Sequence, residues 1–241
     1  MVRRDFAGRF KNTHVGMLWS VLNPLLFLAV FYFIFKVVLE IAVDRYASFV
    51  FTGILAWAWC QASLTQATTS ISSNPGLVSQ PGFPVASLPL VAALSNLLNL
   101  CISLPVLLLL LFLEDARTSA TIVILPIIAA AQLLFILSIG YFVAALNVRF
   151  RDVQYVLPIL LQLGYYVTPI FYDVGRIGPK YAWVLQLNPM YYILDGYRTV
   201  LIEGRMPDLM PILAVAAASA ILLHFTLRYF EDARRRFLEE L

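Results

Sequence analysis

Charge is scarce in this chain of 241 residues, and it is placed very unevenly. Only 13% of the residues are Asp, Glu, Lys or Arg, whereas soluble domains usually carry about 25%. Between Arg45 and Glu114, 68 consecutive residues carry no charge at all. Such a stretch cannot cover a water-facing surface, so the composition excludes an ordinary soluble domain.

Cysteine and histidine are also scarce, with two residues of each. Cys60 and Cys101 both lie inside apolar runs, and His14 and His224 are isolated from other ligand-type residues. We therefore expect neither a disulfide framework nor a metal site. The net charge of +3 does not indicate nucleic-acid binding either, because the cations are scattered between apolar blocks and do not gather on one face.

Long apolar runs are what the sequence does contain, since 61% of its residues are hydrophobic. A membrane-spanning helix needs roughly 20 mostly apolar residues. Six segments reach this length, at 21–39, 49–69, 88–113, 121–146, 153–172 and 209–228. We therefore expect an all-α integral membrane protein that forms a single transmembrane domain over residues 1–241. It would consist of an interface helix at 1–20, six transmembrane helices at 21–228 and a cytoplasmic tail at 229–241.

The segment 173–208 holds two apolar patches that are separated by Asn188 and Pro189. A single span across it would place Asp195 and Arg198 near the middle of the bilayer, at a cost of about 2.5 to 3.5 kcal/mol each. Two half-helices that dip into the membrane from the outer side avoid this cost. We expect such a re-entrant half-helix pair before the last span.

Lysine and arginine are asymmetrically distributed between the two sides that six spans would create. Ten of them fall on the side that holds both termini, and six fall on the other side. Because cytoplasmic segments carry the excess of these cations, both termini are predicted to be cytoplasmic.

The first twenty residues interleave cations with aromatic side chains. At 100° per residue, Phe6 and Phe10 share one stripe that cations flank, which is typical of a helix lying in the headgroup plane and contacting membrane lipid. An ordinary positive flank that only fixes topology remains an open alternative. The candidate interface residues are Arg4, Phe6, Arg9, Phe10, Lys11 and Trp19.

Three stretches together carry a resemblance to a known family. They are RRDFAGRFKNTHVGMLWSVLNP at the start, ALNVRFRDVQYVLPILLQLGYYVTPIFY at 145–172 and LNPMYYILDGYR at 187–198. In this order they resemble the membrane subunits of type-two ABC exporters, in particular those that move lipid-linked polysaccharides such as O-antigen, capsule and teichoic acid. The resemblance implies a homodimer in the bacterial cytoplasmic membrane, two copies of a separate ATPase, and an undecaprenyl- or similar lipid-linked glycan as substrate.

A phosphate-binding loop of the form G-x-x-x-x-G-K-[ST] does not occur in the sequence, because GRIGPK at 175–180 lacks both the spacing and the hydroxyl residue. We therefore expect no cofactor on this chain, with ATP and Mg bound by the partner subunit. The resemblance assigns the coupling to the ATPase to the loop after the second span, which is uncharged here. The candidate residues of this coupling loop are Leu77, Val78, Phe83 and Pro84. The resemblance also implies an outer gate formed by the half-helices before the last span, and its candidate residues are Asn188, Pro189, Tyr191 and Tyr192.

Aromatic side chains suit a conduit for sugars, because they offer flat apolar surfaces and, in tyrosine, a hydroxyl group. The resemblance assigns the lining of the pore chiefly to the first and fifth spans. The candidates there are Phe27, Phe31, Tyr32, Phe35, Tyr155, Gln162, Tyr165, Tyr166 and Tyr172. Contact with lipid or packing between helices is the open alternative for each of them.

Other residues have two interpretations each. Arg149 and Arg151 precede the fifth span, where they would meet a pyrophosphate headgroup or only fix the topology. Trp57 and Trp59 are expected in an interfacial aromatic belt. Polar residues inside the spans, Asn96, Asn99 and Gln132, would line a polar path or, as we favour, form hydrogen bonds between packed helices.

The function that fits these patterns is that of a channel-forming subunit of an ATP-driven exporter of lipid-linked polysaccharide, and not that of an enzyme. An exporter subunit for a smaller amphiphile, such as a lipo-oligosaccharide or a drug, is an alternative. An ion-coupled transporter is disfavoured, because spans two to five contain no ionisable residue near mid-bilayer. A membrane enzyme that acts on lipid-linked sugars is a less favoured alternative, because no cluster of His, Asp or Glu is available for acid-base chemistry.

Overall fold

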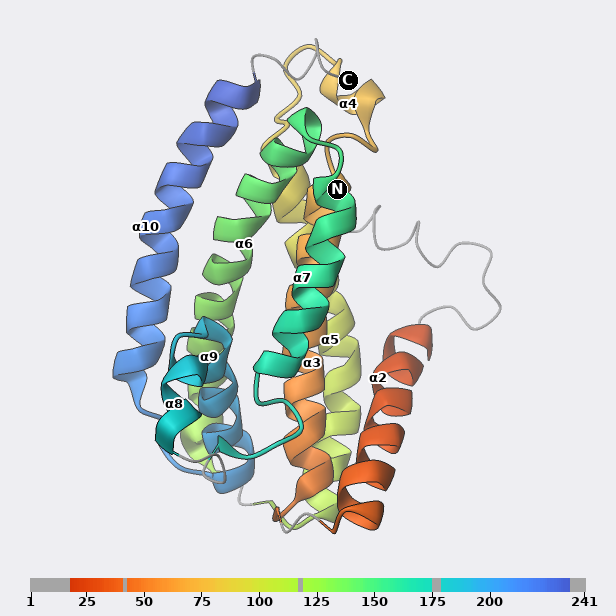
Figure 1. Cartoon of the computed structure of the whole chain (residues 1–241), viewed down its shortest axis with the longest axis vertical. Helices are drawn as coiled ribbons and strands as arrows, with labels where there is room; N and C mark the ends of the chain where they lie inside the picture. Colours follow the sequence, from red (N-terminus) through yellow and green to blue (C-terminus); the bar gives the residue numbers. More distant parts are fainter. Residues whose placement is uncertain (1–17, 41–42, 117–118, 175–178, 235–241) are drawn as a thin grey trace.

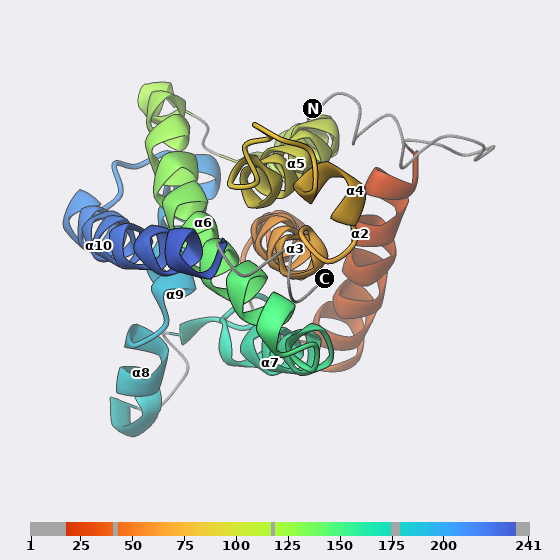
Figure 2. The same cartoon turned by 90° about the horizontal axis from the view of Figure 1, so that it is seen from above.

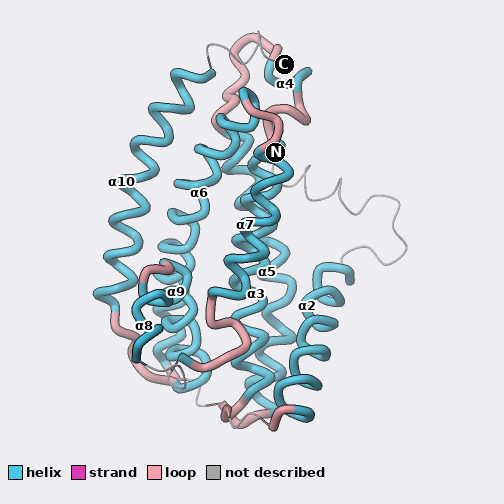
Figure 3. The backbone as a smooth tube through the Cα atoms, in the orientation of Figure 1, coloured by secondary structure: helices cyan, strands magenta, loops and turns pink. Residues whose placement is uncertain are grey.

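The computed structural model describes residues 18–40, 43–116, 119–174 and 179–234. These residues are all-helical and contain no strand (Figure 3), which confirms the predicted all-α class. The α-helices are α2 (Leu18–Phe31), α3 (Tyr46–Thr69), α4 (Pro75–Val78), α5 (Ser87–Leu113), α6 (Leu125–Arg149), α7 (Val153–Val167), α8 (Pro179–Gln186), α9 (Pro189–Arg198) and α10 (Leu209–Arg234). Helix α2 continues as a π-helical stretch (Tyr32–Val38), α6 is preceded by a 3-10 turn (Ala120–Ile124), and α9 continues as a π-helical stretch (Thr199–Glu203).

Among the described residues, five helical segments are long and apolar enough to cross a membrane. They are Val21–Val38, Tyr46–Thr69, Ser87–Leu113, Ala120–Arg149 and Leu209–Arg234. The fifth predicted span is shorter than expected, because α7 has 15 residues and covers only about 22 Å of a hydrocarbon core that is about 30 Å thick. The count of six spans therefore stays a prediction.

The predicted end of the fifth span at residue 172 is wrong, and the reason is local. Helix α7 ends at Val167, and Thr168 is extended, with φ of −78° and ψ of 133°. Thr168 precedes Pro169, and a residue before proline is disfavoured in the helical region because the proline ring crowds it. The predicted boundary at residue 229, between the last span and the cytoplasmic tail, stays a prediction. Helix α10 continues to Arg234 because Phe230 is buried against the ring of Tyr141.

Helix α3 lies in the middle of the bundle, with α2, α5, α6 and α7 around it (Figure 2). Its sequence suits this place, because small residues let neighbouring backbones approach closely. A side chain at Gly53 would meet the guanidinium of Arg198 at 3.0 Å and the backbone of Ile170 at 3.2 Å. Two of its threonines bond within the helix, since Thr52 Oγ1 donates to the Ser48 carbonyl and Thr68 Oγ1 to the Leu64 carbonyl, each over 2.8 Å.

One end of the bundle, which we call the α4 end, holds α4, the turn between α6 and α7 and the last residues of α10 (Figure 1). It has its own small core, in which Ile71, Val78, Val85, Tyr141 and Phe230 are buried. Arg234 donates to the carbonyl of Phe83 over 3.3 Å, so the end of α10 is joined to the loop after α4.

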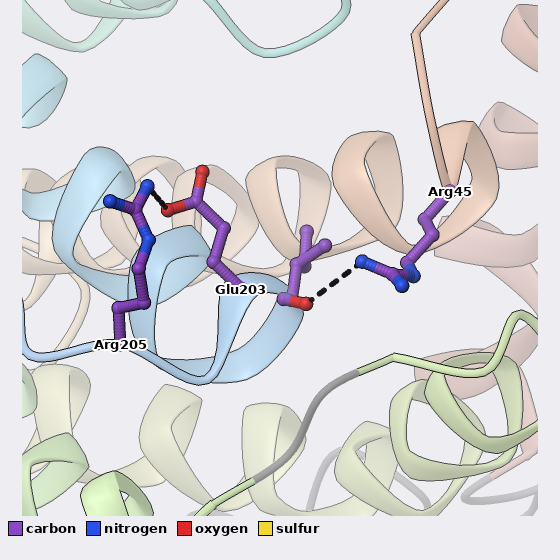
Figure 4. A network of polar contacts seen from close by, with 4 residues as sticks. Arg45, Glu203 and Arg205 are labelled. Carbon is purple, nitrogen blue, oxygen red and sulfur yellow. Dashed lines mark hydrogen bonds and ion pairs between the residues drawn. The ribbon is translucent and has the colours of Figure 1, made fainter.

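The opposite end, the α9 end, is held by polar contacts to backbone groups. Arg45 donates through Nε to the carbonyl of Glu114 over 3.1 Å. Its Nη1 donates to the carbonyl of Ile202 over 3.3 Å (Figure 4). Arg205 forms an ion pair with Glu203 beside it (Figure 4). The Glu114 carboxylate accepts from the backbone N–H groups of Ala47 and Ser48, at 3.2 and 2.8 Å, and so caps the start of α3.

Two short helices, α8 and α9, precede α10 at this end (Figure 1), where the sequence predicted two half-helices. Asn188 caps α9, since its Oδ1 accepts from the N–H of Met190 over 3.0 Å and Pro189 occupies the first turn. Its Nδ2 donates to Thr168 Oγ1 over 2.7 Å, which joins α9 to the end of α7. The depth of the pair in the membrane stays a prediction.

Candidate substrate cavity

A cavity of about 690 Å³ lies between α2, α3 and α7. Helix α3 provides half of its lining residues: Ile54, Trp57, Ala58, Gln61, Ala62, Thr65, Gln66, Thr68 and Thr69. Helix α7 provides Gln154, Leu157, Pro158, Gln162 and Tyr165, while α2 provides Asn23, Pro24 and Phe27 and α5 provides Asn96. Phe27 and Gln162 are exposed, so the cavity is open at its rim.

Helical periodicity explains why these side chains meet. Trp57, Gln61 and Thr65 follow one another at four-residue intervals and therefore lie on one face of α3. On α7, Gln154, Pro158 and Gln162 repeat the same interval and therefore also lie on one face of their helix. The indole N–H of Trp57 donates to Gln61 Oε1 over 3.1 Å, which fixes both side chains on the wall.

Tyr165 is the most enclosed of the predicted aromatic residues, with 9% of its surface exposed. Its ring lies 6.1 Å from that of Trp57 and 6.2 Å from that of Phe31, between centroids. Its hydroxyl group is buried and finds no hydrogen-bond partner among the described residues. A buried hydroxyl group without a partner is costly, so this group stands out among the side chains that line the cavity.

The predicted channel residues fall into three groups. Phe27, Gln162 and Tyr165 line the cavity together. Phe31 and Phe35 instead pack on Phe171, each with 5.2 Å between ring centroids, and join α2 to the segment after α7. The remaining candidates lie outside the cavity: Tyr32, Tyr155 and Tyr166, which are exposed, and Tyr172, whose hydroxyl group donates to the Val167 carbonyl over 2.9 Å. A channel role for these residues stays a prediction.

Arg149 and Arg151 are exposed at the α4 end, in the turn between α6 and α7. The guanidinium of Arg149 lies 5.3 Å from the ring centroid of its neighbour Phe150. Gln154, three residues after Arg151, lines the cavity, and its N–H donates to Asn147 Oδ1 over 3.0 Å. The two arginines thus flank the end of the cavity that lies nearest the α4 end, without lining it.

The expected aromatic belt at Trp57 and Trp59 is wrong. Both side chains are buried, with 5% and 2% of their surfaces exposed, because α3 is surrounded by other helices. The Trp59 indole donates to the Ala93 carbonyl over 3.0 Å. The hydrogen bonds that we favoured between packed helices are present for two of the three residues, since Gln132 Nε2 donates to the Ala56 carbonyl and Asn96 Nδ2 to Gln66 Oε1, over 2.7 and 2.8 Å. Asn99 Nδ2 donates within its own helix, to Asn96 Oδ1 over 3.3 Å.

The sequence reasoning missed most of the polar wall of the cavity. Gln61, Thr65, Gln66, Thr68 and Gln154 were not among the candidates, although they line it. The sequence did contain a signal for this wall, because polar residues recur at helical spacing through the second half of the predicted span 49–69.

The loop after α3 contains the residues that are predicted to contact the ATPase, Leu77, Val78, Phe83 and Pro84. Val78 is buried in the core of the α4 end, and Leu77 and Phe83 pack against that core. Leu77 and Phe83 are half-buried and Pro84 is exposed, so a contact of these residues with the ATPase stays a prediction. The exposed residues of this loop are Pro75, Gly76, Ser79, Gln80, Pro81, Gly82 and Pro84.

The predicted gate residues Asn188, Pro189, Tyr191 and Tyr192 lie at and just after the start of α9, where the rings of the two tyrosines are 5.0 Å apart. The predicted interface residues Arg4, Phe6, Arg9, Phe10 and Lys11 lie outside the described residues. Trp19 belongs to the first turn of α2.

Comparison with known proteins agrees with this architecture. The family of ABC-2 type transporters matches residues 1–202. The O-antigen export system permease protein RfbA of Myxococcus xanthus is 33% identical over all of this chain and 94% of its own length. The protein of the same name from Klebsiella pneumoniae is 30% identical over 86% of this chain and 80% of its own length. The polysialic acid transport protein KpsM of Escherichia coli is 22% identical over 98% of this chain and 92% of its own length. The chain belongs to the family of ABC-2 type transporter membrane proteins.

Proposed function

We propose that this chain is the channel-forming permease subunit of an ATP-driven exporter that moves lipid-linked polysaccharide across the cytoplasmic membrane. The observation that carries the proposal is the similarity, over 86 to 100% of the chain, to relatives named O-antigen export permeases. The cavity supports it, because amide groups, hydroxyl groups and aromatic rings line a space that is open at its rim. These are the groups that contact sugars.

Two further parts belong to this proposal. A separate cytoplasmic ATPase binds ATP and Mg and supplies the energy, since the sequence lacks the phosphate loop that such chemistry needs. A second copy of this chain completes the passage, and both termini of each copy face the cytoplasm. Exposed apolar side chains on α2 and α7 are available for a second copy or for lipid, among them Val30, Ile159 and Leu163.

The proposal is tested with the chain co-expressed with the ATPase that it pairs with and purified in lipid nanodiscs. We expect a stable complex whose ATP hydrolysis rises when a polyprenyl diphosphate-linked oligosaccharide is added. The polyprenyl diphosphate without sugar is the matched control and should stimulate much less. Failure to form a complex, or equal stimulation by both lipids, would contradict the proposal.

A further inference from the structure

The lining of the cavity between α2, α3 and α7 is uncharged. None of its eighteen described lining residues is Asp, Glu, Lys, Arg or His, whereas ten carry an amide or hydroxyl group. A smaller cavity of about 160 Å³ between α2, α3 and α5 shares Asn23 and Asn96 with it and also lacks charged lining residues among those described. The polar interior of this part of the bundle is therefore neutral throughout.

A neutral lining determines which ligands are stable in the cavity. An anion that leaves water for a site of low dielectric constant pays a large desolvation cost unless a cation compensates it. Arg149 and Arg151 are the cations that lie closest in sequence to the lining residue Gln154. Both are exposed, and neither lines the cavity. Carboxylate-bearing or phosphate-bearing ligands are therefore disfavoured inside it.

Amide groups favour ligands with hydroxyl groups instead. An amide offers both donors and an acceptor, and a hydroxyl group likewise donates and accepts. The wall of α3 from Ile54 to Thr69 runs over about 22 Å at about 1.5 Å per residue, and a groove of this length suits a chain of linked rings. The volume of about 690 Å³ lies within the range of roughly 300 to 1,000 Å³ that is usual for ligand sites.

Tyr165 adds a buried polar group at the wall of the cavity. Its hydroxyl group is buried and unpartnered among the described residues, although its side chain lines the cavity. The Trp57 ring beside it also lines the cavity and provides a flat apolar surface, while the Trp57 indole N–H is already bonded to Gln61. A hydrogen-bonding group next to an aromatic face matches a sugar ring, whose hydroxyl groups lie at its edge and whose C–H groups lie on its faces.

We propose that this cavity binds an uncharged, hydroxyl-rich stretch of the transported glycan and discriminates against acidic sugars. Tyr165 and Gln61 provide hydrogen bonds, and Trp57 provides the apolar surface. The inference rests on the proposed function, and it adds the chemical class of the sugar units that the chain accepts.

The test uses the nanodisc complex with its ATPase and two probes that share one polyprenyl diphosphate. One probe carries a mannose oligosaccharide, which is neutral, and the other carries a sialic acid oligosaccharide, which is anionic. The concentration that gives half-maximal stimulation of ATP hydrolysis is measured for each. We expect this concentration to be about tenfold lower for the neutral probe.

Two cavity variants and one matched control sharpen the test. Tyr165→Phe removes one hydroxyl group and should raise the half-maximal concentration of the neutral probe about threefold to tenfold, which corresponds to one lost hydrogen bond, with little effect on the anionic probe. Gln61→Lys places a cation on the wall and should improve the response to the anionic probe while weakening that to the neutral one. Tyr229→Phe, on α10 against Phe142 and away from the cavity, should change neither.

The outcomes separate this inference from the proposed function. Stimulation by both probes at equal concentrations, or equal effects of the variants on both, would overturn the neutral-glycan site and leave the exporter intact. Stimulation by neither probe would overturn the exporter proposal, and the cavity inference with it.

Discussion

Arg198 of α9 lies over the ring of Phe49 in the first turn of α3, with 3.4 Å between the guanidinium carbon and the ring centroid. The same guanidinium donates to the carbonyls of Pro169 and Ile170, over 2.7 and 2.8 Å, and to that of Phe49. One side chain therefore joins α9, the central helix and the segment that follows α7. The carbonyls of Pro169 and Ile170 follow the end of α7 and therefore have no helical partners, so the Arg198 guanidinium provides their hydrogen bonds.

Arg198→Lys is expected to destabilise the protein although it keeps the charge. Lysine lacks the planar fork that reaches several carbonyls at once, so buried acceptors lose their partners. The loss of hydrogen bonds from a charged group costs about 1.5 to 3 kcal/mol each. The melting temperature of the purified protein in detergent, followed by size-exclusion chromatography after heating, should fall by several degrees.

Arg205→Lys is the matched control for this change. Arg205 is largely exposed and pairs only with the nearby Glu203 among the described residues, and such exposed pairs contribute about 0 to 1 kcal/mol. Equal melting temperatures for the two variants would show that Arg198 does not hold the three segments together.

Gly53→Ala should also destabilise the same junction. A Cβ atom at this position would lie 3.0 Å from the Arg198 guanidinium and 3.2 Å from the backbone of Ile170. In an unobstructed helix the same change stabilises by up to about 1 kcal/mol, because glycine is the poorer helix former. A lowered melting temperature therefore reports the close approach. Gly76→Ala is the control, since nothing lies within 4 Å of its added Cβ; a Gly53→Ala protein as stable as the parent would contradict the packing.

The junction also shows how far sequence reasoning reaches in this chain. The apolar runs predicted the long helices well, because length and hydropathy alone decide them. Arg198 was placed in a half-helix that avoids the middle of the bilayer, but its contacts could not be predicted, since its partners are backbone carbonyls more than twenty residues away, which carry no sequence signal. Trp57 and Trp59 were placed in a belt for the same reason, because only the arrangement of neighbouring helices buries them.

The cap on α3 gives a third stability prediction. The Glu114 carboxylate accepts from two backbone N–H groups at the start of α3, at the positive end of the helix dipole. Glu114→Ala should cost about 0.5 to 2 kcal/mol, the usual range for a lost cap. Glu231→Ala, on the exposed face of α10, is the control. The melting temperatures of both variants are measured in the same detergent. Equal melting temperatures would show that the Glu114 cap does not contribute to stability.

The loop after α3 yields a prediction about its accessible face. Gln80 is exposed, whereas Val78 is buried in the core of the α4 end with 8% of its surface exposed. In a Cys101→Ser background, which removes the exposed native thiol and keeps the buried Cys60, a maleimide should label Gln80→Cys quickly and Val78→Cys at least about tenfold more slowly.

If the loop couples to the ATPase through its exposed residues, assembly of the complex should protect Gln80→Cys and leave Val78→Cys unchanged. Fast labelling of Val78→Cys in the isolated chain would show that the loop opens and exposes its apolar side chains to a partner. Labelling of Gln80→Cys that the ATPase does not slow would remove this position from the contact.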